Sequence, residues 1–114
     1  MKFLLLLHGD ADGESALSAD ERRAIVQEHI AYASTLRDLG VYVSGEALEG
    51  RESAAVVRPG STPIVTDGPF AETKEALGGF YVVDVESREQ ALDLAGKAPL
   101  SPGLAVEVLA IAEF

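Results

Sequence analysis

The chain has 114 residues, a mass of 12.0 kDa and a formal net charge of -10, which is the size of one domain. Its nine Lys and Arg residues are dispersed among 19 Asp and Glu residues, so the composition excludes a basic surface for nucleic acid or anionic membranes. The absence of cysteine excludes disulfides, thiol nucleophiles and Cys-ligated zinc, and it fits a cytoplasmic location.

The first segment, residues 2–8, is a continuous apolar run that ends in a histidine. This run predicts a strand buried on both faces. It is too short for a signal peptide or a membrane span, so we expect neither. The acidic run at residues 10–14 lacks the spacing of a calcium-binding loop, and we interpret it as a solvated loop.

Two helices are predicted from capping-box spacing and from the residues that end them. Ser18 and Glu21 begin a helix that ends at Gly40, a residue that tolerates a left-handed terminus. Ser87 and Gln90 begin a second helix that runs to about residue 97.

The remaining segments predict strands over residues 41–50, 53–60, 63–68, 78–87 and 104–114. The resulting order of strands and helices is that of an α+β fold, a ferredoxin-like sandwich with an inserted hairpin. Helices would cover only one face of such a sheet, and its other face is also apolar, so we predict a homodimer. The alternative is a monomer whose open face is shielded by the loop around Asp67.

The two histidines are the only side chains that titrate near neutral pH without perturbation. His29 lies on the apolar stripe of the first predicted helix, so it faces inward. It is either a core imidazole, held by a backbone carbonyl or by Tyr32, or a general acid or base oriented by a carboxylate. His8, at the end of the first strand, either packs ordinarily or contributes to a substrate pocket.

The stretch TDGPF, residues 66–70, combines turn residues with an aspartate. Asp67 either accepts backbone hydrogen bonds within a turn or, if it is partly buried, needs a partner such as His29. Histidine and aspartate in contact form a minimal pair for proton transfer. Phe70 would then contact the substrate. Lys74, in the next loop, is either solvated or close enough to the substrate to neutralise an oxyanion.

The stretch VTDGPFAETKEALGGFYVVDV, residues 65–85, resembles the signature of the YCII-related family and of its DGPF subgroup. The segments MKFLLLLHG, HIAYASTLRDLGVYVSGEALEG and VEVLAIAEF match the layout of that family in the same order. The resemblance therefore spans residues 1–114 as a single domain. It implies a dimeric α+β barrel built from ferredoxin-like chains.

For function, the resemblance implies a pocket with a histidine and aspartate pair, here His29 with Asp67, and with His8 as the alternative histidine. A related family member acts as a dehydrochlorinase on a chlorinated hydroxyquinol, and the wider structural class contains lactone isomerases and small monooxygenases. We therefore expect an enzyme of the lyase or isomerase type, without cofactor or metal, that acts on a small, ring-containing molecule. The alternative is a noncatalytic ligand-binding or regulatory module associated with transcription control, because DGPF members are often encoded near alternative sigma factors.

Overall fold

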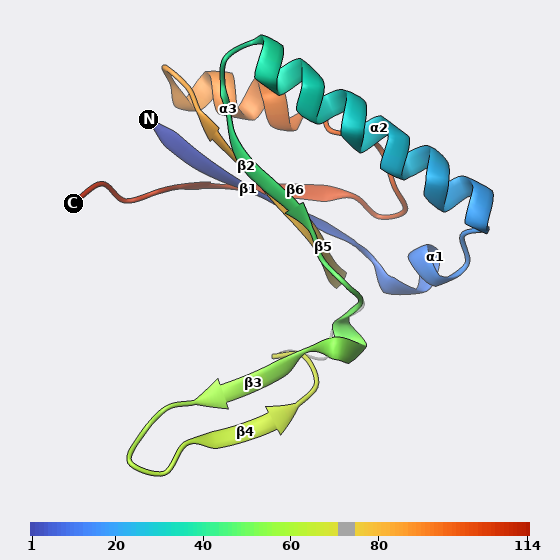
Figure 1. Ribbon diagram of the computed structural model, residues 1–114, viewed down its shortest axis with the longest axis vertical. Coiled ribbons are helices and arrows are strands. Elements are labelled where there is room, and N and C mark those ends of the chain that lie inside the picture. The colour runs from blue at the N-terminus through green and yellow to red at the C-terminus, as the bar shows by residue number, and fades with distance from the viewer. Residues whose placement is uncertain (71–74) are drawn as a thin grey trace.

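The computed structural model describes residues 1–70 and 75–114. A four-stranded antiparallel sheet forms its main body, and α2 and α3 lie on the same face of that sheet (Figure 1). The strands follow the order β2-β5-β1-β6, with bounds β1 (Lys2–Asp10), β2 (Tyr42–Ala47), β5 (Glu75–Asp84) and β6 (Ala105–Ala110). The other elements are α1 (Ala11–Ser15), α2 (Ala19–Asp38), a 3-10 turn η1 (Arg51–Ser53), β3 (Ala55–Arg58), β4 (Ile64–Asp67) and α3 (Arg88–Ala95). The predicted α+β class is confirmed.

Helix α2 begins where the capping box predicts. The Ser18 hydroxyl accepts a hydrogen bond from the Glu21 backbone N–H at 3.1 Å, and the Glu21 carboxylate accepts one from the Ser18 backbone N–H at 3.0 Å. Gly40, with φ of 74°, follows the end of the helix. The two reciprocal bonds satisfy backbone N–H groups that would otherwise lack a partner.

The prediction of a helix that begins at Ser87 is also confirmed. The prediction of a solvated loop before α2 is wrong. The Ser87 hydroxyl accepts from the Gln90 backbone N–H at 3.1 Å at the start of α3. Residues 11–15, within the segment predicted as a solvated loop, form the short helix α1, whose N-cap Asp10 accepts from the Asp12 backbone N–H at 3.2 Å. A helix at this point turns the chain back toward α2.

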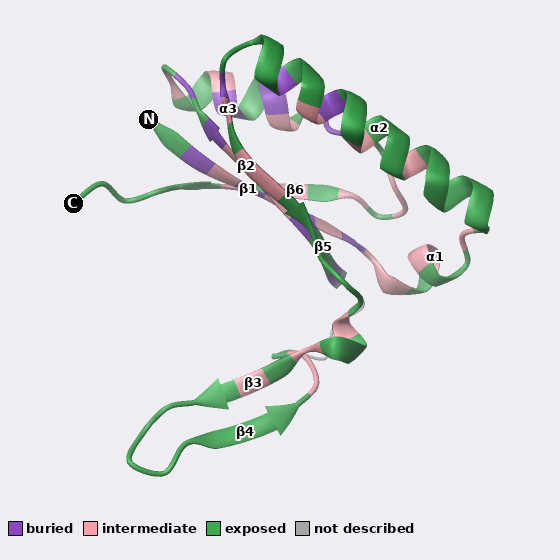
Figure 2. Cartoon of the chain, viewed as in Figure 1, coloured by how far each residue is buried: buried purple, intermediate pink, exposed green. Residues whose placement is uncertain are grey.

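The core lies between the helices and one face of the sheet (Figure 2). In β1, Phe3, Leu5 and Leu7 are buried, whereas Leu4 and Leu6 on the opposite face are partly exposed. This alternation follows from the period of a strand. The prediction that the first strand is buried on both faces is therefore wrong for a single chain.

The hairpin of β3 and β4 stands away from the main sheet, on the side opposite α2 (Figure 1). The chain has a radius of gyration of 15.7 Å, compared with about 13 Å for a compact domain of about 100 residues. Val57, Ile64 and Val65 of the hairpin are each more than half exposed. The expectation of a hairpin is confirmed for β3 with β4, but β2 pairs with β5 in the main sheet.

In the part of the chain that the structure describes, no helix is both long enough and apolar enough to cross a bilayer.

Candidate functional site

A cavity of about 660 Å³ lies along α2 and the adjoining part of the sheet. Apolar side chains form most of its wall, including Leu7, Ile25 and Ile30. Polar and charged side chains also line it, among them His29, Glu14 and Arg22. A cavity that combines apolar surface with polar groups has the composition expected of a site for a small organic molecule.

His29 is fixed to the sheet by Tyr81. Its Nδ1 lies 2.8 Å from the Tyr81 hydroxyl, and the imidazole tautomer determines which of the two donates the hydrogen bond. The rings are nearly parallel, at 17°, with centroids 6.0 Å apart. The bond links α2 to β5 and restricts the orientation of the imidazole in the cavity wall.

Tyr81 is itself held by Tyr32. The Tyr32 ring meets the Tyr81 ring edge-on, with centroids 5.2 Å apart, a favourable arrangement for two aromatic rings. The buried Tyr32 hydroxyl donates to the Leu94 backbone carbonyl at 2.6 Å. The orientation of His29 is thus supported by a chain of contacts that reaches α3.

Burial determines the protonation states of these residues. It lowers the pKa of His29 below its ordinary 6.5, while the charge of Glu28 acts in the opposite direction. Burial raises the pKa of Tyr81 above 10.0, and it raises that of Tyr32 to about 12. At neutral pH the cavity therefore holds an uncharged imidazole next to a protonated phenol.

The family model of the YCII-related domain matches residues 1–114. The chain belongs to the YCII-related family. Among curated proteins, an uncharacterised protein, R00369, from Rhizobium meliloti (strain 1021) is 37% identical over 97 residues. The match covers 83% of this YCII-related chain and 77% of the relative.

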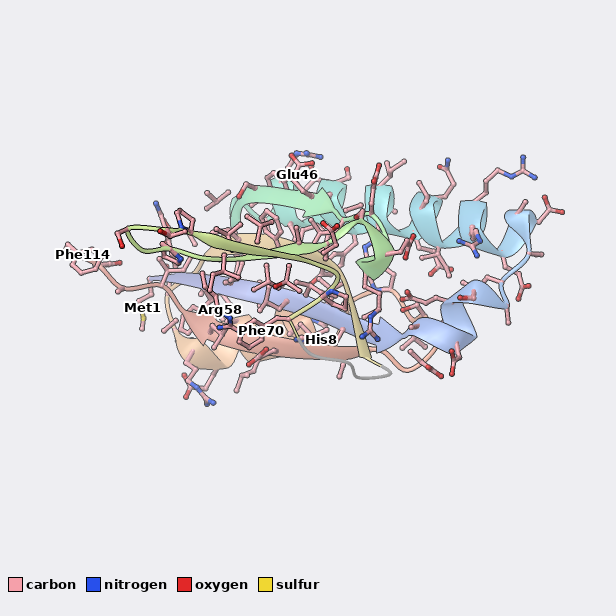
Figure 3. The ribbon with its side chains drawn as sticks, turned by 90° about the horizontal axis from the view of Figure 1, so that it is seen from below. Met1, His8, Glu46, Arg58, Phe70 and Phe114 are labelled. Carbon is pink, nitrogen blue, oxygen red and sulfur yellow. The ribbon has the colours of Figure 1, made fainter. Side chains whose placement is uncertain are left out.

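His8, predicted to contact substrate, is among the residues that line the cavity of this YCII-related chain. Strand alternation directs its side chain to the face of the sheet opposite the helices, where Nε2 lies 3.0 Å from Glu107 Oε1. Figure 3 shows His8 from the side of the hairpin. His8 therefore projects from the face of the sheet opposite the helices, whereas His29 projects from α2, which covers the other face.

Asp67 lies at the end of β4, where it is exposed and does not line the cavity. Gly68 has φ of 108°, the positive φ expected of the glycine in the TDGPF stretch, and the chain bends there. Within one chain, the structure brings His29 into the cavity wall but does not bring Asp67 to it. A catalytic role for Asp67 stays a prediction.

The other two predicted substrate contacts also come from the region after β4. Phe70 is 77% exposed, and the Arg58 guanidinium lies 5.6 Å from the centre of its ring (Figure 3). Phe70 does not line the cavity. Lys74 lies outside the described residues.

The sequence did not identify Tyr81 or Glu14 as site residues. Tyr81 stands in a run of β-branched and aromatic residues that predicts a strand, and nothing in that run distinguishes a ligand-facing hydroxyl from core packing. Glu14 was assigned to a solvated loop, but it lies in α1, is half-buried and lines the cavity. Across residues 1–70 and 75–114, no group of three or more His, Asp or Glu side chains is arranged to hold a metal ion.

Proposed function

We propose that the chain is a small, cofactor-independent enzyme of the lyase or isomerase type that transfers protons on a small, ring-containing organic molecule. The observation that supports this function is the 2.8 Å contact between His29 Nδ1 and the Tyr81 hydroxyl in the wall of a largely apolar cavity. A neutral imidazole with a fixed orientation is the side chain best suited to accept a proton near neutral pH.

In the proposed mechanism His29 Nδ1–H donates to the Tyr81 oxygen, which leaves Nε2 with a lone pair. Nε2 takes a proton from the bound molecule, and the resulting imidazolium later returns a proton or releases it to water. Tyr81 serves as a positioning residue. General acid–base catalysis by such a group typically contributes on the order of a hundred- to ten-thousand-fold to the rate.

In this proposal, Asp67 would act on His29 of a second chain. It is carried by a hairpin that extends beyond the main sheet of its own chain, so the histidine and aspartate pair would form only if the hairpin of one copy reached His29 of another. In that arrangement the carboxylate would stabilise the imidazolium. If the hairpin does not reach His29, Tyr81 alone orients the imidazole.

We also propose a ferredoxin-like chain that forms a dimeric α+β barrel in the cytoplasm, within the DGPF subgroup. The strand order β2-β5-β1-β6, with α2 and α3 on one face, supports this assignment. The uncovered sheet face carries Leu4, Leu6 and Leu109, the last of them 41% exposed. A second copy packed sheet against sheet would remove this apolar surface from water.

A noncatalytic ligand-binding module, associated with transcription control, is the second candidate. The separation of Asp67 from His29 within one chain favours it, because an isolated imidazole can recognise a ligand without reacting. To distinguish the two, we would incubate the protein with chlorinated hydroxyquinols and lactones and follow turnover by mass spectrometry. The enzyme proposal predicts turnover that is lost in a folded His29→Ala variant. Turnover equal to wild type in His29→Ala, with an unchanged circular dichroism spectrum, would reject it.

The same assay on Asp67→Asn tests the contribution from a second chain. A loss of turnover at unchanged fold would assign Asp67 to the site. Full turnover would leave Tyr81 as the residue that orients His29.

A further inference from the structure

We infer that Glu14 is a second catalytic residue of the cavity: it gives a proton to the carbonyl oxygen of a bound ring ketone or lactone while His29 takes a proton from the neighbouring carbon. The inference rests on the proposed function of His29 and extends it to a substrate class, cyclic molecules with a carbonyl group and an acidic C–H bond.

The position of the Glu14 side chain carries the inference. Glu14 projects from α1, is half-buried, and lines the same cavity as His29. Its carboxyl group lies against bare backbone, since a Cβ on Gly9 would overlap it and a Cβ on Gly78 would lie 4.0 Å from Oε1. Among residues 1–70 and 76–114, no side chain or backbone group forms a hydrogen bond with this carboxyl group. Within those residues, no group competes with a bound molecule for its two oxygens.

Glu14 and His29 line the same cavity at different positions along α2. Arg22 Nη2 donates to the Glu14 backbone carbonyl at 3.0 Å, which places Glu14 next to the first turns of α2. Arg22 and His29 both line the cavity, and they are seven residues apart on one face of the helix. Seven residues of α-helix rise about 10 Å. The cavity therefore extends along α2 from Arg22, beside Glu14, to His29, and the proposed ring would occupy the part between them.

Three glycines contribute to the wall of the cavity. Gly45 of β2 and Gly78 and Gly79 of β5 line it, and a glycine presents only backbone to a ligand. A Cβ on Gly78 would meet no atom closer than 3.8 Å. An added Cβ would thus make only ordinary van der Waals contact, and in the proposed complex the ring rests against the strand at Gly78.

The electrostatic environments of the two groups suit opposite roles. Burial raises the pKa of Glu14 above 4.5, with Asp10 acting in the same direction and Arg22 against it. Burial lowers the pKa of His29 below 6.5. Two titratable groups shifted in opposite directions in one cavity are the usual arrangement of an acid and a base. Among residues 1–70 and 76–114, the other charged groups around Glu14 are Glu49, Arg51 and Glu52. In the same part of the chain, the titratable and charged groups around His29 are Glu28, Tyr32, Arg37, Tyr42, Glu46 and Tyr81.

The proposed step is an enolisation of the bound carbonyl compound. The C–H bond next to the carbonyl breaks, and its proton goes to His29 Nε2. The electron pair of that bond forms a C=C bond, while the carbonyl π electrons form an O–H bond with the proton of Glu14. The products are the enol, an imidazolium and a carboxylate. His29 and Glu14 then return to their starting states by exchanging protons with water.

Solvent deuterium uptake tests this step. Cyclic ketones and lactones would be incubated in D2O with wild type, Glu14→Gln, His29→Gln and the control Glu89→Gln, whose exposed side chain lies in the first turn of α3. Wild type and Glu89→Gln should incorporate deuterium next to the carbonyl. Glu14→Gln should be slower, on the order of a hundredfold, and His29→Gln should show no uptake above the buffer.

The pH profile provides a readout that a structural role for Glu14 would not change. A rate that requires neutral His29 and protonated Glu14 peaks midway between their pKa values and falls on both sides of that pH. Glu14→Gln should lose the fall on the alkaline side and rise to a plateau, whereas Glu14→Asp should keep that fall at a lower rate.

Three outcomes are decisive. The predicted rates and profiles support the inference. Uptake that is lost in His29→Gln but has wild-type rate and profile in Glu14→Gln overturns the role of Glu14 and leaves the proposed function intact. No uptake with wild type overturns this inference together with its substrate class, and turnover of the chlorinated hydroxyquinols would then show whether the proposed function survives.

Discussion

His29 Nδ1 and the Tyr81 hydroxyl lie 2.8 Å apart, although the two residues are 52 positions apart in the chain. The contact joins the helix that carries the imidazole to a central strand of the sheet. It gives the imidazole a fixed neighbour in the cavity wall, and the proposed chemistry depends on that fixed geometry.

The Tyr81→Phe variant tests this contact. It removes the hydroxyl but keeps the ring against Tyr32, so the free energy of unfolding should fall by about 1 kcal/mol. Turnover should fall by about tenfold, since a similar amount of transition-state stabilisation is lost. Urea unfolding and steady-state kinetics measure the two effects. Unchanged turnover in Tyr81→Phe would show that the hydroxyl does not position His29.

Tyr32→Phe should reduce stability more than Tyr81→Phe does, and turnover less. The Tyr32 hydroxyl donates a hydrogen bond to the Leu94 carbonyl at 2.6 Å in the core. The variant lacks this hydroxyl, so the carbonyl loses its hydrogen bond. An unsatisfied buried acceptor costs about 1–3 kcal/mol, so this variant should be less stable than Tyr81→Phe but should retain more turnover. Lower turnover in Tyr32→Phe than in Tyr81→Phe would contradict the assigned roles.

The pH dependence of stability should show two opposing contributions. His29 has a lowered pKa in the folded chain, so its contribution is fully present above 6.5 and is lost as pH falls from 6.5 through the folded pKa. Glu14 has a raised pKa, so its contribution is present below 4.5 and is lost as pH rises through the folded value. Urea unfolding across this range should show that His29→Gln lacks the first loss and Glu14→Gln the second. The same pH dependence in all three proteins would rule out these shifts.

Gly78 and Gly45 should respond differently to an added side chain. A Cβ on Gly78 would lie no closer than 3.8 Å to any atom, whereas a Cβ on Gly45 would lie 2.7 Å from the Tyr81 ring. Gly78→Leu should therefore keep most of its stability and lose ligand binding. Gly45→Ala should lose about 1–3 kcal/mol through overpacking. Calorimetry with a ring-containing ligand, and thermal unfolding, distinguish the two. Normal ligand binding by Gly78→Leu would place the ligand elsewhere.

The proposed dimer predicts a mass of about 24 kDa in light scattering, twice that of one chain. Leu109→Glu should dissociate it, because Leu109 lies on the uncovered sheet face beside Leu4. Leu92→Glu is the matched control, since Leu92 is 39% exposed and Leu109 41%, but Leu92 lies on α3. A mass of one chain for wild type at micromolar concentration would reject the dimer.

The helices could be predicted because their start signals are local. Ser18 with Glu21, and Ser87 with Gln90, satisfy backbone groups within four residues, and such contacts leave a direct trace in the sequence. The pairing of β2 with β5 was not predicted, because their pairing depends on tertiary packing across some 30 residues of chain.

The site was predicted only in part, because its contacts join distant segments. The periodicity of α2 placed His29 on an inward face, and the structure brings it into a cavity wall. Tyr81 could not be predicted as the neighbour of His29, because the sequence of a strand does not show which helix side chain it contacts. Glu14 was missed because five residues are too few for a helical period to show.

The central claim is that His29 transfers a proton rather than only binding the ligand. Its most direct test is to measure ligand affinity and turnover separately in His29→Gln, which retains a polar side chain but cannot act as a base. We predict affinity within a few-fold of wild type and turnover reduced at least a hundredfold. Wild-type turnover by folded His29→Gln, with the ligand bound normally, would contradict the account.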